Sequence, residues 1–325
     1  MKMPDPVALR SRIKLRQLLL LEALDGERSL HKAARRIAMT QPNATRLLNE
    51  LEDLLGVPLF ERSASGMVTT PYGETMIHHA KVLLADLDHA AQDIAMMSRG
   101  SSGHVRIGTM PSTAPHILAK ALGRSAENEP ALRISLIEGA HEMLADRLLR
   151  GELDIVIGRA RPDVSMQGLR VTSLVQEVYS LVCKPQHPLA SRSVLQLGDV
   201  VDEGWILPPP QMPVRQNLDA MFSAACGRSP PAMMESQSLF VNLLVIRNSR
   251  LLCMMPMRTA TSFEGSGLLA RLPLDLQGIS DPVVMLLREG AVLSRGAQRL
   301  VGWLETEARI QMDNEGGTAP VTRPS

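Results

Sequence analysis

Side chains that can hydrogen-bond to nucleic-acid bases are concentrated in one short stretch near the N-terminus. Gln and Asn amides pair bidentately with adenine, an Arg guanidinium pairs with guanine or a phosphate, and a Thr methyl packs on the methyl of thymine. A proline in this stretch fits the first turn of a helix, where its missing N–H removes no hydrogen bond. The residues concerned are Thr40, Gln41, Pro42, Asn43, Thr45 and Arg46. Their chemistry is that of base readout.

The charge around this stretch favours contact with a polyanion. The chain of 325 residues has a formal net charge of +1, but residues 28–49 contain no Asp or Glu. A local positive field therefore persists on a nearly neutral protein, as a phosphate-facing surface requires. A basic helix face turned only to solvent would normally include carboxylates for pairing. The cationic residues of this window are Arg28, Lys32, Arg35, Arg36 and Arg46.

The spacing of apolar residues predicts three helices that position these side chains. Leucines at helical spacing over residues 15–24 predict a core helix. Ser29 is the expected N-cap of a short helix over residues 30–37. Thr40 is the expected N-cap of a longer helix with a leucine stripe, which Gly56 ends. Two helices joined by a turn of about three residues form a helix-turn-helix, whose second helix enters the major groove of DNA.

A two-stranded wing is expected after the second of these helices. Residues 58–62 predict one strand, residues 63–66 a polar tip and residues 67–70 the returning strand. Such a wing places Arg62 against a phosphate or in the minor groove. The helix spacing alone leaves open an all-α domain that contains two helices and a short turn.

A longer pattern of residues makes the assignment specific. It consists of Ala33-Ala34, Thr40-Gln41-Pro42, Leu51-Glu52, Leu55-Gly56-Val57-Pro58-Leu59-Phe60-Glu61-Arg62 and Thr70-Pro71-Tyr72-Gly73. Over residues 12–73 the chain closely resembles the DNA-binding domain of LysR-type transcriptional regulators. The resemblance implies a winged helix-turn-helix over residues 1–70 that binds duplex DNA at a promoter, with RNA polymerase as a further partner. Many members carry an Arg at the wing tip, where this chain has Ser63-Ala64-Ser65.

A long helix is predicted after the winged domain, over residues 71–99. A helix of roughly 25 residues is nearly 40 Å long and needs a partner for its apolar side. That side either packs on its own chain or pairs two copies. In the resembled family this helix pairs two subunits, which implies a homodimer or homotetramer. The heptad-like seam consists of Ile77, Ala80, Leu84, Leu87, Ala91 and Ile94.

The pattern changes after residue 100 to strands that alternate with helices. The expected strand-helix order runs over residues 105–108, 114–126, 133–137, 142–150 and 154–158. The same alternation returns later in the chain. Strands are expected over residues 204–207, 233–234 and 251–254, with helices over residues 213–225 and from residue 239. Repeated βαβ units predict a mostly parallel sheet, and here two α/β lobes that bind a ligand between them. Strand-to-helix junctions suit a ligand with an anionic group, because helix starts present backbone N–H groups.

Residues 103–108, 149–154 and 187–189 also resemble the LysR family. In that family the two lobes form an effector domain like a periplasmic solute-binding protein, here expected over residues 100–310. A disordered tail is expected over residues 311–325. The residues expected to line the cleft by position are Ser112, Thr113, His141 and Arg159 in the first lobe and Gln211 and Gln237 in the second. For Arg159 a surface or inter-lobe salt bridge is an equal alternative, and His141 is also explained as a plain helix-start residue.

The sequence shows no catalytic or metal-binding motif. It contains no Gly-x-Ser-x-Gly, no phosphate-binding loop and no His-Glu-x-x-His. The cysteines, Cys183, Cys226 and Cys253, are too far apart for paired zinc ligands. We therefore expect a cytoplasmic protein that is not an enzyme and has no cofactor, no metal and no membrane segment. With four Phe, two Tyr and two Trp, a sugar-stacking cleft is disfavoured.

Two other function classes compete with a LysR-type regulator. A sensor or solute-binding protein would use the N-terminal domain only to dimerise, and the acid-free window of residues 28–49 argues against this. Salt-dependent binding to duplex DNA separates the two. An α/β transferase with an appended DNA-binding module would convert its ligand. A regulator only binds it, and ligand binding shifts the placement of its DNA-binding domains.

Overall fold

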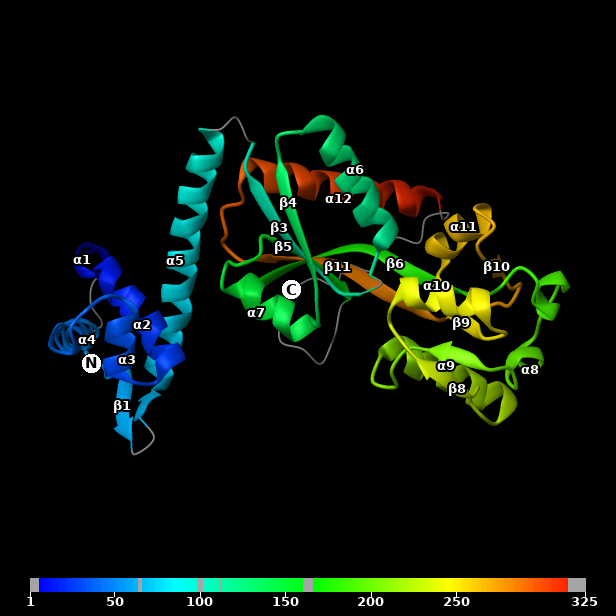
Figure 1. Cartoon of the computed structure of the whole chain (residues 1–325), viewed down its shortest axis with the longest axis horizontal. Helices are drawn as coiled ribbons and strands as arrows, with labels where there is room; N and C mark the ends of the chain where they lie inside the picture. The colour runs from blue at the N-terminus through cyan, green and yellow to red at the C-terminus, as the bar shows by residue number, and fades with distance from the viewer. Residues whose placement is uncertain are drawn as a thin grey trace. The chain divides into compact units, whose positions relative to one another are not determined.

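The computed structural model describes residues 6–63, 66–98, 102–111, 113–159, 166–276 and 278–314. The chain divides into two compact units, the first formed mainly by residues up to 100 and the second mainly by the residues after them (Figure 1). Each unit is described by itself.

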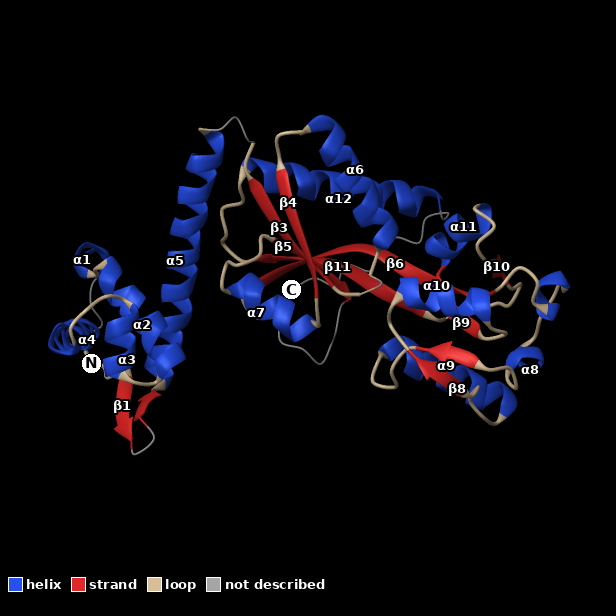
Figure 2. Cartoon of the chain, viewed as in Figure 1, coloured by secondary structure: helices blue, strands red, loops and turns tan. Residues whose placement is uncertain are grey.

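The N-terminal unit is a winged helix-turn-helix, as predicted (Figure 2). Its elements are α1 (Pro6–Arg12), α2 (Leu15–Glu27), α3 (Leu30–Arg36), α4 (Gln41–Leu55), β1 (Phe60–Ser63), β2 (Gly66–Thr69) and α5 (Pro71–Met97). The leucines of α2 and α4 form the core with Ala33 and Ala34 of α3, whose small side chains let the helices approach closely. Helix α2 continues to Glu27, beyond the predicted range of residues 15–24, and ends at Arg28 in the left-handed conformation (φ 49°).

Residues of the specific sequence pattern fasten the wing to the helices. The Oε1 atom of Glu52 accepts hydrogen bonds from the N–H groups of Leu59 (2.7 Å) and Phe60 (3.2 Å). The Thr70 hydroxyl donates to the Leu59 carbonyl (3.2 Å) and accepts from the N–H of Gly73 (3.1 Å), so it caps α5. A Cβ at Gly73 would collide with the Leu59 carbonyl oxygen. These residues therefore set the angle between the wing and α5.

Helix α5 has two halves with different surroundings. In its first half Ile77, Ala80 and Leu84 are buried in the core of the N-terminal unit, against α2. In its second half Leu87, Ile94 and Met97 are exposed. The predicted seam therefore packs on its own chain at first and presents apolar surface further along.

The first lobe of the C-terminal unit follows the predicted order of strands and helices. It contains β3 (His104–Thr109), α6 (Pro115–Asn128), β4 (Arg133–Glu138), α7 (His141–Leu149) and β5 (Ile155–Arg159). The strands are parallel in the order β4-β3-β5, with Thr109 opposite Glu138 at the carboxyl ends of β3 and β4. Val105, Ile107 and Ile155 are fully buried in its core.

The second lobe repeats this construction. Its elements are η1 (Pro188–Ser191), α8 (Leu197–Val200), β7 (Trp205–Leu207), α9 (Pro213–Cys226), β8 (Ala232–Glu235), α10 (Leu239–Asn248), β9 (Leu252–Pro256) and α11 (Met257–Gly265). Strands β8, β7 and β9 are parallel, and Leu207 lies opposite Glu235. The Trp205 ring meets Phe222 edge to face in the core, with 5.4 Å between ring centroids.

Two long antiparallel strands, absent from the prediction, join the lobes. They are β6 (Leu169–Cys183) and β11 (Ser280–Arg288), and the sheet order is β4-β3-β5-β11-β6-β9-β7-β8, with the short β10 (Ala270–Arg271) beside β6. Strand β6 pairs with β11 and then with β9, so one strand serves both lobes (Figure 1). The prediction of a mostly parallel sheet thus holds within each lobe, and the complete sheet is mixed.

The last helix, α12 (Arg295–Asn314), lies beside α6 over the first lobe (Figure 1). It extends into the region predicted as a tail from residue 311, because the apolar spacing of Leu300, Leu304 and Ala308 carries a buried face to the end of the helix. Gln311 is only 8% exposed, and its carbonyl accepts a hydrogen bond from Arg258 (3.0 Å). Residues 315–325 lie outside the described residues. Among the described helices, none has both the length and the apolar character to cross a membrane.

Candidate functional site

The first turn of α4 presents a row of exposed polar side chains. Gln41 and Asn43 are exposed, and so is Pro42, which occupies the first turn as predicted. Thr40 is the N-cap by its backbone conformation, but its side chain makes no capping hydrogen bond. Ala44 is fully buried in the core of the unit, which fixes the direction in which its neighbours point. The helix therefore turns its polar residues outward and is held by its apolar ones.

The next turn of α4 carries Thr45 and Arg46. The Thr45 hydroxyl donates to the carbonyl of Gln41 (3.0 Å), which leaves its methyl group for packing. The Arg46 side chain is 70% exposed, with 3.7 Å between its Nη1 and Oε1 of Glu50. The Lys14 ammonium hydrogen-bonds to Glu50 (2.8 Å) and lowers the pKa of that carboxyl below its usual value. An exposed pair at this distance is weak, so Arg46 can contact another anion.

Arg62 is exposed on β1 and lies opposite Met67. The wing is fixed to α2 behind it, because the N–H of Met67 donates to the carbonyl of Arg28 (2.9 Å). Gly66 has φ 117°, and a Cβ there would lie 2.5 Å from the same carbonyl oxygen. At the tip, the Ser63 hydroxyl donates to the carbonyl of Gly66 (3.0 Å). Residues 64 and 65, which belong to the predicted tip, lie outside the described residues.

A pocket of about 830 Å³ lies between the two lobes of the C-terminal unit. The first lobe contributes the carboxyl ends of β3 and β4 and one side of α6. The second lobe contributes Pro209, which follows β7, and residues 235–240, which join β8 to α10. The volume falls within the ~300–1,000 Å³ range of small-molecule sites.

The predicted cleft residues divide into those that line this pocket and those that do not. Thr113 and Gln237 line it. His141 is buried at the start of α7, and Gln211 is exposed in the turn before α9; the described lining includes neither of them, nor Arg159. Ser112 lies outside the described residues.

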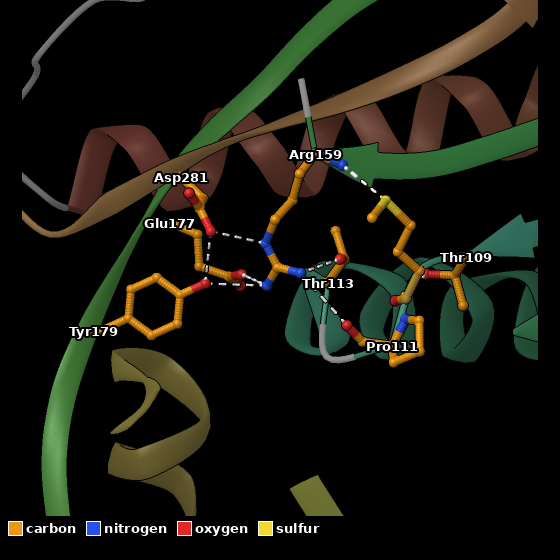
Figure 3. A network of polar contacts seen from close by, with 8 residues as sticks. Thr109, Pro111, Thr113, Arg159, Glu177, Tyr179 and Asp281 are labelled. Atoms are coloured by element: carbon orange, nitrogen blue, oxygen red, sulfur yellow. Dashed lines mark hydrogen bonds and ion pairs between the residues drawn. The ribbon is translucent and has the colours of Figure 1, made fainter. Parts of the chain in front are cut away.

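Arg159 is the centre of a buried network of polar contacts (Figure 3). Its side chain is only 7% exposed. Its Nε lies 3.1 Å from Oδ2 of Asp281, and its Nη2 lies 3.1 Å from Oε2 of Glu177. Nη2 also donates to the hydroxyl of Tyr179 (3.1 Å). These partners lie on β6 and β11, so Arg159 forms salt bridges, but they are buried within the sheet rather than at the surface.

The same guanidinium holds the segment that follows β3. Its Nη1 donates to Oγ1 of Thr113 (2.9 Å) and to the carbonyl of Pro111 (3.4 Å). The Arg159 backbone N–H lies 3.4 Å from the sulfur of Met110. Met110, Pro111 and Thr113 all line the pocket. Arg159 therefore affects the pocket by positioning its wall.

Glu177 is the most perturbed carboxyl of this network. Burial raises its pKa to about 7, although Arg159 favours its ionised form. Glu177 also accepts a hydrogen bond from the N–H of Ala114. Ala114 caps α6 in the left-handed conformation (φ 43°), which is strained for a residue with a side chain. Glu177 thus stabilises the start of the helix that forms one side of the pocket.

The cysteines form neither a disulfide nor a metal site in the described part of the chain. All three are free, and no group of three or more His, Cys, Asp or Glu side chains within the described ranges could hold a metal ion. Burial raises the pKa values of Cys183 and Cys253 to about 12, so both remain thiols near neutral pH.

Several residues of the pocket and network were not predicted. Glu138 and Glu235 end strands directly before helices, and this position in an α/β fold could have pointed to them. Glu177 and Asp281 lie on the strands that were not predicted, so their pairing with Arg159 had no signal in the sequence.

Comparison with known proteins decides the family. Residues 15–74 match the model of the bacterial regulatory helix-turn-helix proteins of the lysR family, and residues 98–309 match the LysR substrate binding domain. The chain belongs to the LysR family. It is a DNA-binding transcriptional regulator whose C-terminal lobes bind a small-molecule effector. The family is one of regulators rather than enzymes.

Curated LysR-type relatives align over most of the chain. The HTH-type transcriptional regulator GbpR of Azospirillum brasilense is 31% identical, over 94% of this chain and 89% of that protein. The HTH-type transcriptional regulator GalR of Pseudomonas putida is 30% identical, over 88% of this chain and 72% of that protein.

Solved structures of LysR-type regulators share the fold. Full-length OxyR C199D from Pseudomonas aeruginosa has a TM-score of 0.59 at 20% identity, covering 92% of this chain and 95% of that one. Full-length CbnR in complex with its target DNA has a TM-score of 0.56 at 19% identity, covering 91% and 100%. Full-length BenM has a TM-score of 0.51 at 26% identity, covering 95% and 100%.

Proposed function

We propose that this LysR-type regulator reads its operator with the first two turns of α4 and that Arg62 on the wing contacts the DNA backbone. The observation that carries the proposal is the outward row of Thr40, Gln41 and Asn43 over a buried Ala44. The side chains of Gln41 and Asn43 make no hydrogen bond with other described residues. Their amides are therefore available for base edges.

The proposed regulator acts as a homodimer or homotetramer. Its domains are a DNA-binding domain over residues 1–70, a dimerising helix over residues 71–99 and an effector domain over residues 100–310. The exposed second half of α5 supports pairing of two copies. Two copies present two recognition helices to an operator with two-fold symmetry. Regulation then acts on RNA polymerase at the promoter, in the cytoplasm.

The effector is proposed to bind in the pocket between the lobes. Thr113 and Gln237 contact it directly, with Ser112 as a further predicted contact. A ligand that binds one relative arrangement of the lobes more tightly shifts the population toward that arrangement. The shift changes the fit of the two DNA-binding domains to the operator.

The DNA assignment is tested with Arg46→Ala in the full-length protein. Fluorescence anisotropy with duplex DNA from beside its own gene measures affinity over a series of salt concentrations. Losing a bidentate base contact lowers affinity about 5- to 150-fold, and losing a phosphate contact also lowers the salt slope by ~1. Arg309→Ala, an exposed cation on α12, is the matched control. Equal affinity of the two variants at physiological salt would contradict the assignment.

A further inference from the structure

The walls of the pocket between the lobes carry an unusual balance of charge. Their described residues include two carboxylates, Glu138 and Glu235, and no Lys, Arg or His. Both acids stand at the carboxyl ends of parallel strands, Glu138 opposite Thr109 and Glu235 opposite Leu207. In open α/β sheets this edge is where ligands bind. The two carboxylates therefore approach the ligand position from opposite lobes.

Nearby cations compensate these carboxylates only weakly. Glu138 is exposed and forms no ion pair with any other residue that the structure describes. The Glu235 side chain is 50% exposed, and its nearest cationic atom is Nη1 of Arg215 at 3.8 Å. Arg215 has a closer partner, Oδ2 of Asp219 at 2.8 Å. A ligand with its own negative charge would meet repulsion from both lobes.

The helix starts beside the pocket are partly capped by groups of the chain itself. Helix α6 begins with Pro115, which has no N–H, and the N–H of Ala114 already donates to Glu177. At α10, the Ser238 hydroxyl accepts the N–H of Val241 (3.3 Å) and so uses one of the free amides. This capping leaves fewer helix-start amides for an anionic ligand group at both α6 and α10.

Hydroxyl groups complete the polar part of the wall. The Ser236 oxygen accepts a hydrogen bond from the N–H of Ser238 (3.2 Å), and the Thr113 oxygen accepts one from Arg159 (2.9 Å). Each of these hydroxyls, like that of Ser238, keeps its own proton to donate. The pocket thus offers hydroxyl donors together with carboxylate acceptors. A ligand hydroxyl satisfies both, because it donates to a carboxylate and accepts from a hydroxyl.

One aromatic ring lies on the same wall. Phe240 is 71% exposed, although it is large and apolar, and it lines the pocket together with Leu136. A flat apolar ring beside carboxylates matches a molecule with C–H groups on one face and hydroxyls around its edge. The scarcity of aromatic residues in the chain disfavoured a sugar-stacking cleft, but the fold places one of the four Phe at the pocket.

We propose that the effector is an uncharged polyhydroxylated molecule of mono- to disaccharide size, an inference that rests on the proposed effector site. Glu138 and Glu235 accept hydrogen bonds from its hydroxyls, the Thr113, Ser236 and Ser238 hydroxyls donate to it, and Phe240 packs on its apolar face. A ligand carboxylate is excluded by the two acids.

Calorimetry with the full-length protein tests this ligand class. The probes are D-glucose, D-galactose, L-arabinose, myo-inositol, maltose and lactose, with D-glucuronate, D-galacturonate and benzoate as anions and D-glucosamine as a cation. At least one neutral probe is expected to bind. If that probe is D-glucose or D-galactose, the corresponding uronate is expected to bind at least tenfold more weakly. Benzoate is also expected to bind at least tenfold more weakly than the best neutral probe. Glu138→Gln and Glu235→Gln each weaken the neutral ligand, whereas Glu127→Gln on the exposed side of α6 leaves it unchanged.

Three results would overturn the polyol class: an anion that binds as tightly as the best neutral probe, glucosamine at least tenfold tighter than glucose, or no binding by any neutral probe. Leu136→Trp, which fills the pocket from an exposed position, separates this inference from the proposed site. If a ligand of any class still binds the folded Leu136→Trp variant at full strength, the site itself is misplaced. If that variant loses a ligand that is anionic, the site stands and only the polyol class fails.

Discussion

At the scale of single residues, Arg159 shows how a side chain can matter to a ligand site without facing it. Its guanidinium forms ion pairs with Glu177 and Asp281 in the interior and hydrogen-bonds to the wall of the pocket. Removing one partner of a buried ion pair leaves uncompensated charge, which costs more than the pair contributes. Because Arg159 lies between two carboxylates, its removal leaves both of them buried without a cationic partner.

Arg159→Ala is therefore expected to lower the free energy of unfolding by about 3–5 kcal/mol. Chemical denaturation of the full-length protein, followed by circular dichroism, measures the change. Arg150→Ala, which breaks an exposed pair with Asp146, is the control and should cost at most about 1 kcal/mol. An Arg159→Ala variant of normal stability that no longer binds effector would instead make Arg159 a direct ligand contact.

Glu177 should make stability depend on pH. Its pKa is raised by burial from 4.5 to about 7 in the folded chain, so between these values the folded state binds the proton more tightly than the unfolded state. The stability that this group contributes is greatest below pH 4.5, falls as pH rises through about 7 and is constant above. In the Glu177→Gln variant, the midpoint of chemical unfolding should no longer fall as pH rises from 5 to 8. A wild-type slope that persists in the variant would assign the titration to another group.

At the scale of elements, the join between wing and α5 depends on close backbone contact. Thr70 caps α5 and Gly73 lies against the carbonyl of Leu59, so the wing and the helix can meet only with glycine there. The same join places the wing beside α4, through the bonds of Glu52 to the start of β1. Operator affinity should therefore respond to a change that touches no DNA.

Gly73→Ala should destabilise the N-terminal unit and weaken operator binding, because its Cβ would overlap the Leu59 carbonyl oxygen. Thermal unfolding and DNA anisotropy measure the two effects. Gly123→Ala, inside α6 with open space around the new Cβ, is the matched control and should stabilise the chain by about 0.5–1 kcal/mol. Equal behaviour of the two variants would show that the wing moves freely relative to α5.

At the scale of the whole molecule, we propose that the second half of α5 pairs copies of the chain. Leu87 and Ile94 are one heptad apart and exposed, whereas Ile77 and Leu84 are used within the chain. An apolar stripe that one chain leaves uncovered is the kind of surface by which two helices pair.

Leu87→Glu with Ile94→Glu should convert the proposed dimer to monomers and weaken operator binding, since each monomer presents one recognition helix. Light scattering after size-exclusion chromatography measures the mass. Gln92→Glu, exposed on the side of the same helix that faces away from this stripe, should leave the dimer intact. A double variant that stays dimeric would move the interface off this stripe.

The DNA-binding domain was largely determined by the sequence itself. The Ser29 cap, Pro42 in the first turn of α4, Gly56 at its end and the leucine stripe all act over one or two helical turns, so the order of residues suffices to predict them. The motif that includes Glu52 and Gly73 was visible as a pattern. The structure adds the physical reason for it, which is contact between the wing and α5.

The ligand site was decided by tertiary structure. Thr113 and Gln237 could be placed from strand and helix order, but Arg159 could not be assigned without Glu177 and Asp281, which β6 and β11 bring to it. Those strands are antiparallel partners far apart in the chain, and no local period shows which distant residues meet. For the same reason Glu138 and Glu235 become one acidic pocket only when the two lobes are folded around it.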